Sequence, residues 1–184
     1  FGPLAFDERT YRKELDTWAE EAAPGLRRKN GERLLRELNR FLFEEKGLRP
    51  DREEYEDPDN GLLNRVLDRR AGIELTLSTL TLLLARRLDL PISGIGMPGH
   101  FLLRYDGPDG EIYFDPYDRG RLLSKADCIG FLMASGFDFE NAYLFPSPNR
   151  EILTRMIDHL ESVYRTRKIT SRQVRLLRCR KQLG

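Results

Sequence analysis

The chain has 184 residues, of which 40% are hydrophobic and 33% are charged. This length and balance fit one globular domain, or one domain with a short helical appendage, and exclude a fibrous or disordered chain. The 31 Lys and Arg residues nearly balance the 30 Asp and Glu residues, so no overall field draws the chain to nucleic acid or to a membrane surface. No apolar run approaches the ~20 residues of a membrane span, and we expect no membrane partner.

Hydrophobic residues recur at three- and four-residue steps through the first half of the chain, which is the spacing of amphipathic helices. Pro24-Gly25 is expected to end the first helix, and Gly47 is expected to cap the second. Leucines on most sides of the predicted helix 74–88 indicate that protein surrounds this helix. The predicted helices cover residues 7–21, 31–46, 62–70 and 74–88.

The pattern changes after Pro91 to short segments rich in Ile, Leu, Phe and Tyr, which predict strands. The turn residues 106–110 predict that the second and third strands form an antiparallel hairpin. Helical spacing then returns toward the C-terminus. The predicted strands cover residues 92–97, 101–105 and 112–114, and the later helices cover 124–134, 150–165 and 170–180.

Three polar residues converge in this arrangement. Glu74 begins the buried helix, His100 opens one strand of the hairpin, and Asp115 closes the other. In nucleophilic catalysis, such a carboxylate fixes the tautomer of the histidine, and the histidine activates a thiol or hydroxyl at a helix N-terminus. A histidine bound to a carboxylate for structural reasons alone is the other interpretation.

The order of these elements resembles the transglutaminase-like superfamily, whose triad is Cys, His and Asp. More closely, several ordered motifs resemble the bacterial SirB-type branch, which is often linked to regulation and carries a tetratricopeptide-like C-terminal tail. The motifs are DPDNGLLNRVL at residues 57–67, RRAGI at 69–73, PGHFL at 98–102, DPY at 115–117 and GRLL at 120–123.

The resemblance assigns His100 as the triad histidine and Asp115 as the triad aspartate. It places Glu74 where the superfamily has its cysteine, so the catalytic positions that we expect are a triad remnant without its nucleophile. The SirB-type branch usually has a proline at that position, so this chain departs from both patterns. A glutamate in a first helical turn also has a structural role, because it interacts favourably with the helix dipole.

Other nucleophiles and a metal site are weaker alternatives. Ser78 and Thr76 lie on the same helix, but a hydroxyl lacks the low pKa of a thiol, and Cys128 has no motif around it. The two cysteines, Cys128 and Cys179, lack the spacing of a zinc site. A chain with a core of this size needs no disulfide, so we expect reduced thiols in a cytoplasmic protein. We expect neither a cofactor nor a bound metal, although Glu74, His100 and Asp115 together are a conceivable divalent-cation site.

Three further segments have an ordinary and a functional interpretation. The acidic loop 51–60 is either a connection or a lid over the His100 cleft. His159 is expected at the surface or partly buried on its helix. The C-terminal basic residues favour a solvated helix face over a nucleic-acid surface; they are Arg165, Arg167, Lys168, Arg172, Arg175, Arg178, Arg180 and Lys181.

The sequence therefore predicts an α+β fold with a transglutaminase-like (papain-like) core, in which one buried helix packs against a small antiparallel sheet. We expect residues 1–146 to form this domain with N-terminal helices, and residues 147–184 to form a C-terminal helical extension. The predicted function is a non-catalytic regulatory or protein-interaction module with an unidentified protein partner. The alternative is a hydrolase or amide-processing enzyme that uses His100 as a general base on water.

Overall fold

The computed structural model describes residues 7–169, 176 and 180. Within these residues, six α-helices and a four-stranded antiparallel sheet build an α+β domain, as predicted. Within the described ranges, every helix is too short or too polar to serve as a membrane span. The helices are α1 (Glu8–Leu26), α2 (Gly31–Asn39), α3 (Leu63–Arg69), α4 (Glu74–Arg87), α5 (Lys125–Ala134) and α6 (Asn149–Thr166).

The sheet has the strand order β3-β4-β5-β6, so each strand pairs with its neighbour in the sequence. The predicted hairpin is present, with Gly107 opposite Gly110 at its turn. A fourth strand and a two-residue parallel pair were not predicted, because runs this short have no measurable period. The strands are β1 (Arg49–Pro50), β2 (Ala71–Gly72), β3 (Ile92–Met97), β4 (His100–Gly107), β5 (Gly110–Asp115) and β6 (Arg121–Leu123).

The first helix corrects one prediction, because α1 continues through Pro24 to Leu26. Trp18, Ala22 and Leu26 are all buried on one side of this helix, and that packing carries the helix past the proline. The second predicted helix is α2 followed by a π-helical turn, η1 (Arg40–Glu45), and Gly47 ends it with a φ of +70°. The helix predicted for 170–180 falls largely outside the described residues.

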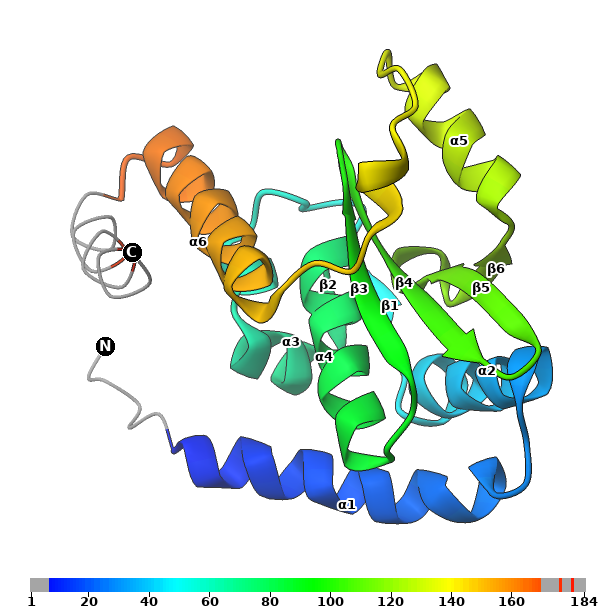
Figure 1. Cartoon of the computed structure of the whole chain (residues 1–184). Coiled ribbons are helices and arrows are strands. Elements are labelled where there is room, and N and C mark those ends of the chain that lie inside the picture. Colours follow the sequence, from blue (N-terminus) through cyan, green and yellow to red (C-terminus); the bar gives the residue numbers. More distant parts are fainter. Residues whose placement is uncertain (1–6, 170–175, 177–179, 181–184) are drawn as a thin grey trace.

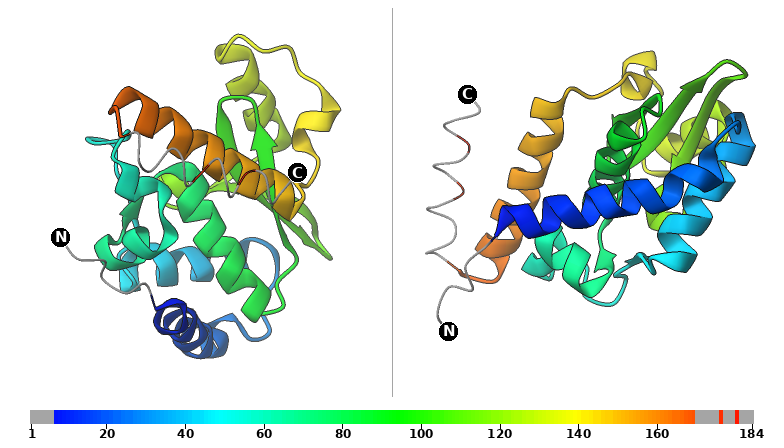
Figure 2. Two further views of the ribbon diagram at one scale, coloured as in Figure 1. Left: turned by 90° about the vertical axis from the view of Figure 1, so that its left-hand side faces the viewer. Right: turned by 90° about the horizontal axis from the view of Figure 1, so that it is seen from below.

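Helix α4 lies in the centre of the domain, between α1, α6 and the sheet (Figures 1 and 2). Leu77, Leu80 and Leu84 on this helix are at most 1% exposed, which confirms the prediction that protein surrounds it. The position of α4 fixes the position of its first residue, Glu74.

Both faces of the sheet are covered. In β4, Phe101 and Leu103 belong to the main core with α4, whereas Leu102 belongs to a smaller core with Cys128 and Leu132 of α5. This alternation is the period of two that strands impose on their side chains. The sheet therefore separates two apolar clusters, and α5 covers the face that α4 leaves free.

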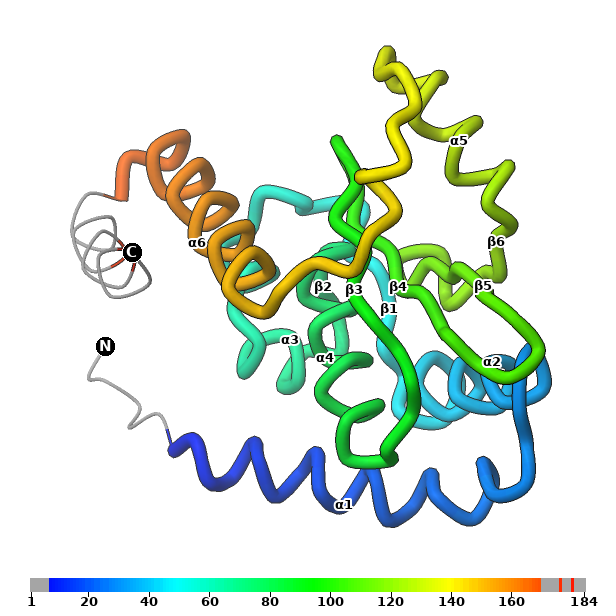
Figure 3. Tube along the Cα trace, viewed as in Figure 1, coloured from blue at the N-terminus to red at the C-terminus, as the bar shows by residue number. Residues whose placement is uncertain are grey.

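The segment after α5 crosses the edge strand β3 to reach α6 (Figure 3). It includes the short 3-10 helix η4 (Asn141–Leu144). Pro146 pairs with Ile95 in an isolated bridge, and the Ser147 amide donates to the Gly94 carbonyl at 2.8 Å. This crossing brings α6 to the N-terminal end of α4, beside the candidate site.

Candidate functional site

A tight turn places His100 at the beginning of β4. Met97 pairs with His100, so Pro98 and Gly99 are the two central residues of the turn. Gly99 has a φ of +75°, which is the conformation that a type II turn requires at its second central position, and proline is favoured at the first. The Pro98-Gly99 turn thus fixes the backbone position of His100, from which the imidazole projects.

Asp115 ends β5 and is oriented by the chain that follows it. Its Oδ1 accepts a hydrogen bond from the Tyr117 amide at 2.8 Å, as the N-cap of the short 3-10 helix η3 (Pro116–Asp118). An aspartate before a proline favours this local turn. The cap holds one carboxylate oxygen and leaves Oδ2 directed at the histidine.

His100 and Asp115 form a direct pair. His100 Nε2 lies 2.8 Å from Asp115 Oδ2, and each side chain is only 13% exposed. Burial opposes protonation of the imidazole, but the hydrogen bond and charge of Asp115 and the charge of Glu74 outweigh it. The pKa of His100 is therefore raised above its ordinary value, and the predicted neighbourhood of these two residues is present.

Glu74 is the first residue of α4 and reaches the same site. Its Oε1 accepts a hydrogen bond from the Tyr55 hydroxyl at 2.7 Å. The helix start is held in place by Thr76, whose hydroxyl accepts from the Ile73 amide at 3.2 Å and donates to the Asn60 carbonyl at 2.8 Å. Glu74 is therefore positioned on a rigid helix end rather than on a loop.

A cavity of about 310 Å³ separates the tip of α4 from the beginning of β4 and from α6. Glu74 and His100 both line it, whereas Asp115 lies behind the His100 ring and does not. The other lining residues are Tyr55, Ile73, Leu75, Gly99, Phe101, Arg155, Asp158 and His159.

The weaker nucleophile candidates have other surroundings. The Ser78 hydroxyl is fully buried and donates to the Phe101 carbonyl at 3.5 Å, while the Thr76 hydroxyl is bound within the helix start. Cys128 is 1% exposed in the smaller core, and burial raises the pKa of its thiol to about 11. None of the three lines the cavity, and Cys179 lies outside the described residues.

The acidic loop places one side chain over the cavity. Asn60 donates to Asp51 Oδ2 at 3.2 Å and to the Glu54 carbonyl at 2.7 Å, and Arg69 pairs with Asp51 and Asp57. These contacts tie both ends of the loop to α3. Tyr55, at the tip between them, is 39% exposed and contacts Glu74.

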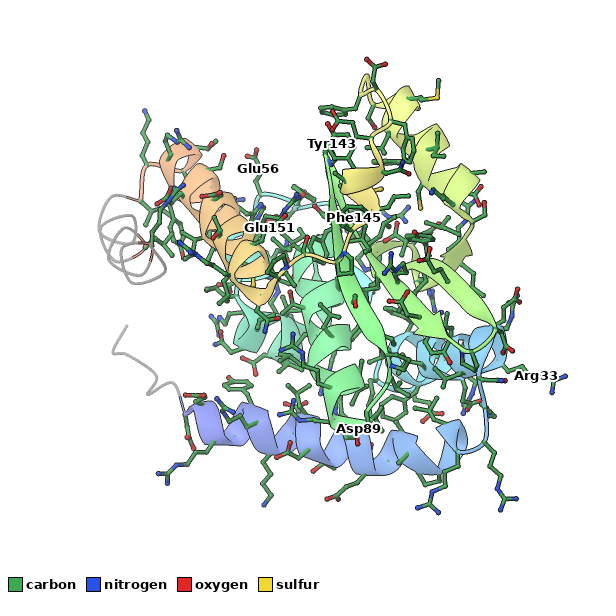
Figure 4. The ribbon with its side chains drawn as sticks, in the orientation of Figure 1. Arg33, Glu56, Asp89, Tyr143, Phe145 and Glu151 are labelled. Carbon is green, nitrogen blue, oxygen red and sulfur yellow. The ribbon has the colours of Figure 1, made fainter. Side chains whose placement is uncertain are left out.

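Helix α6 contributes a wall of the site that sequence reasoning did not assign. Arg155, Asp158 and His159 line the cavity, and the His159 ring meets the Tyr55 ring edge-on at 5.8 Å. Burial lowers the pKa of His159, against the opposing charges of Glu74 and of Glu56, which Figure 4 labels. No local sequence motif predicts that these residues belong to the site, since only the crossing over β3 brings α6 to the cavity.

Within the described ranges, no group of three or more His, Cys, Asp or Glu side chains is arranged to hold a metal ion.

The two histidines provide a direct test of this geometry, because the chain has only these two. The negative charge of Glu74 favours the protonated form of both rings, although burial leaves the pKa of His159 lowered overall. We therefore expect Glu74→Gln to lower the pKa of His100 and that of His159 together, since removing a nearby negative charge destabilises each imidazolium. A proton NMR titration of the two ring signals measures both values.

The control for this titration is Glu44→Gln, which removes an exposed carboxylate from η1, away from the cavity. It should leave both histidine pKa values unchanged. A Glu74→Gln titration in which only one histidine responds would contradict the placement of both rings beside this carboxylate.

Comparison with known proteins gives the family. The model of the transglutaminase-like superfamily, Transglut_core2, matches residues 9–158. A UPF0162 protein of Xylella fastidiosa is 36% identical over 148 residues, which are 77% of this chain and 52% of that protein. F-box only protein 21 of Homo sapiens is 30% identical over 139 residues, 71% of this chain and 22% of that protein.

A UPF0162 protein of Pseudomonas aeruginosa is 37% identical over 110 residues, covering 58% of this chain and 40% of that protein. The chain spans about half the length of the two Xylella fastidiosa UPF0162 proteins that it matches. No solved structure matches it. Because the family model covers most of the chain, including the tip of α4, the hairpin and most of α6, the chain belongs to the transglutaminase-like superfamily.

Proposed function

We propose that this chain is a SirB-type member of the superfamily that has lost the covalent step and acts as a regulatory or protein-interaction module. One observation carries the proposal. Among the described residues, the cavity beside His100 is lined by no cysteine, serine or threonine, and Glu74 occupies the helix tip. Without a thiol or hydroxyl next to the imidazole, His100 and Asp115 alone form no acyl-enzyme.

The shape of the cavity supports a binding role. Its walls combine aromatic and aliphatic surface with charged and polar side chains that can orient a ligand. The cavity is open to one surface, where Tyr55 remains 39% exposed and available to a partner. A protein segment that enters here meets preformed walls from the loop, α4, β4 and α6.

The relatives support a modular role for this region. The matched region is 22% of F-box only protein 21 and 52% of a UPF0162 protein, so it occurs as a part of longer chains. We propose a cytoplasmic setting and a protein partner, because the nearly balanced charge gives no field for nucleic acid. We propose that residues 1–146 form the domain and 147–184 its C-terminal extension, of which α6 closes the cavity.

The intact His100–Asp115 pair supports a second candidate, a hydrolase or amide-processing enzyme. In that case His100 acts as general base on water, Asp115 orients the imidazole, and Glu74 serves as the acid or as a substrate ligand. General-base assistance contributes ~10²–10⁴ in rate, so any such activity should fall by that factor in His100→Ala.

A paired experiment separates the two functions. A photo-crosslinking residue is introduced at Tyr55, which lines the cavity. The control position is Phe145, which Figure 4 labels; it is 63% exposed and is not among the lining residues. We expect a discrete protein crosslink from position 55 alone and no amide, ester or peptide turnover that depends on His100. Turnover lost in His100→Ala, without a crosslink from position 55, would contradict the interaction proposal and favour the enzyme.

A further inference from the structure

Among the residues that the structure describes, one charge in the cavity has no ion-pair partner. Arg155 is bound by the Gly96 and Met97 carbonyls at 2.6 and 3.2 Å and by Glu151, and His100 is paired with Asp115. Across residues 7–169, Glu74 accepts only the neutral Tyr55 hydroxyl through Oε1 and forms no ion pair. A partly buried carboxylate in this state favours a cation beside it, because removing a charge from water without pairing it costs free energy.

A second group in the cavity lacks a hydrogen bond. His159 Nε2 is buried and has no partner within the described part of the chain. Because burial lowers the pKa of His159, the ring is neutral near pH 7 and offers one acceptor nitrogen. Buried polar atoms in native proteins are nearly always paired, so this one points to a polar group of a ligand, which is a donor in the tautomer that carries its proton on Nδ1.

The surrounding surface suits a flat cation. The ring of Tyr55, which is 39% exposed, gives the cavity an aromatic wall, and guanidinium groups stack on such rings. Asp158, an exposed residue that lines the cavity, already pairs with a guanidinium of this chain, that of Arg180, at 3.0 Å. The acceptors therefore come from both α4, with Glu74, and α6, with Asp158 and His159. A ligand group with several donors in one plane can reach acceptors on both helices.

We propose that the cavity binds the guanidinium group of an arginine side chain from the protein partner. The guanidinium pairs with Glu74, donates toward His159 and lies against the Tyr55 ring. A planar group with five donors satisfies acceptors on two walls, whereas an ammonium is a compact, strongly hydrated point charge. The assignment rests on the proposed interaction function and names the chemistry that this function recognises.

Short peptides test the assignment. Three acetylated, amidated tripeptides, Gly-Xaa-Gly with arginine, lysine or citrulline in the centre, are titrated into the full chain while the two histidine ring signals are followed by NMR. We expect a saturable shift of the His159 signal with the arginine peptide and at least ~10-fold weaker binding of citrulline, which has the same shape without the charge. The lysine peptide should also bind more weakly than the arginine peptide.

Variants locate the binding. Glu74→Gln should weaken binding of the arginine peptide by ~10-fold or more and leave citrulline unaffected, because it removes the charge but keeps the volume. Glu44→Gln is the matched control and should change neither. Absence of a saturable shift, equal binding of arginine and citrulline, lysine binding as tightly as arginine, or an unchanged affinity in Glu74→Gln would each overturn the assignment.

The crosslink from position 55 distinguishes this failure from failure of the proposed function. A partner that crosslinks from position 55 equally well with Glu74 present and with Glu74→Gln leaves the interaction function intact and overturns the arginine assignment. If no protein crosslinks at position 55, the interaction function itself fails.

Discussion

A cysteine in place of Glu74 is expected to react with iodoacetamide at pH 7 on the order of ten times faster than an exposed cysteine elsewhere on the chain. The first position of α4 places the new thiol at a helix N-terminus beside His100, whose pKa is raised. A helix dipole and an adjacent imidazolium both stabilise a thiolate. An ordinary thiol is only a few per cent ionised at pH 7, so a lowered pKa multiplies the reactive fraction.

Both variants carry Cys179→Ser, so that Cys179 does not react with the reagent. Cys128 can stay, because it is buried and the pKa of its thiol is raised to about 11. Leu153→Cys, at a 46% exposed position on α6, supplies the reference thiol. Adding His100→Ala to Glu74→Cys should remove most of the acceleration. Equal rates for the two cysteines, or a fast rate that survives loss of His100, would contradict the account of a triad that lacks only its nucleophile.

The second large effect concerns the helix that carries Glu74. Leu77→Ala should lower the free energy of unfolding by about 2–5 kcal/mol, because Leu77 is fully buried in the main core and its loss leaves a cavity. Urea unfolding followed by circular dichroism gives this value. Leu153→Ala removes the same atoms from an exposed site and should cost less than about 0.5 kcal/mol. Similar costs for both variants would contradict the central position of α4.

The fold could be predicted well from local patterns. The helical spacing around Leu77 and Leu84, the turn at 106–110 and the cap at Gly47 each depend on residues close in the sequence. The extent of α1 was predicted wrongly because burial of Leu26 overrides a proline, and burial is a tertiary property. The short strand β6 was missed because three residues show no period.

The site could be predicted only in part. The Asp115–Pro116–Tyr117 motif and the hairpin predicted that His100 and Asp115 lie side by side. In the structure, His100 Nε2 and Asp115 Oδ2 are 2.8 Å apart. The loop that carries Tyr55 was predicted only as one of two alternatives, and the contribution of His159 could not be predicted, since it depends on how α6 approaches α4 from a distant part of the chain. Side chains supplied by non-local packing leave no spacing rule in a single sequence.

The crossing from α5 to α6 also covers part of the edge of the sheet. A sheet with free borders offers unpaired amide and carbonyl groups that template further chains. Here Pro146 and Ser147 bind along β3, and proline cannot extend a ladder of hydrogen bonds. The opposite border, β6, has only three residues. Edge-to-edge pairing of two such sheets therefore meets less free backbone at both borders.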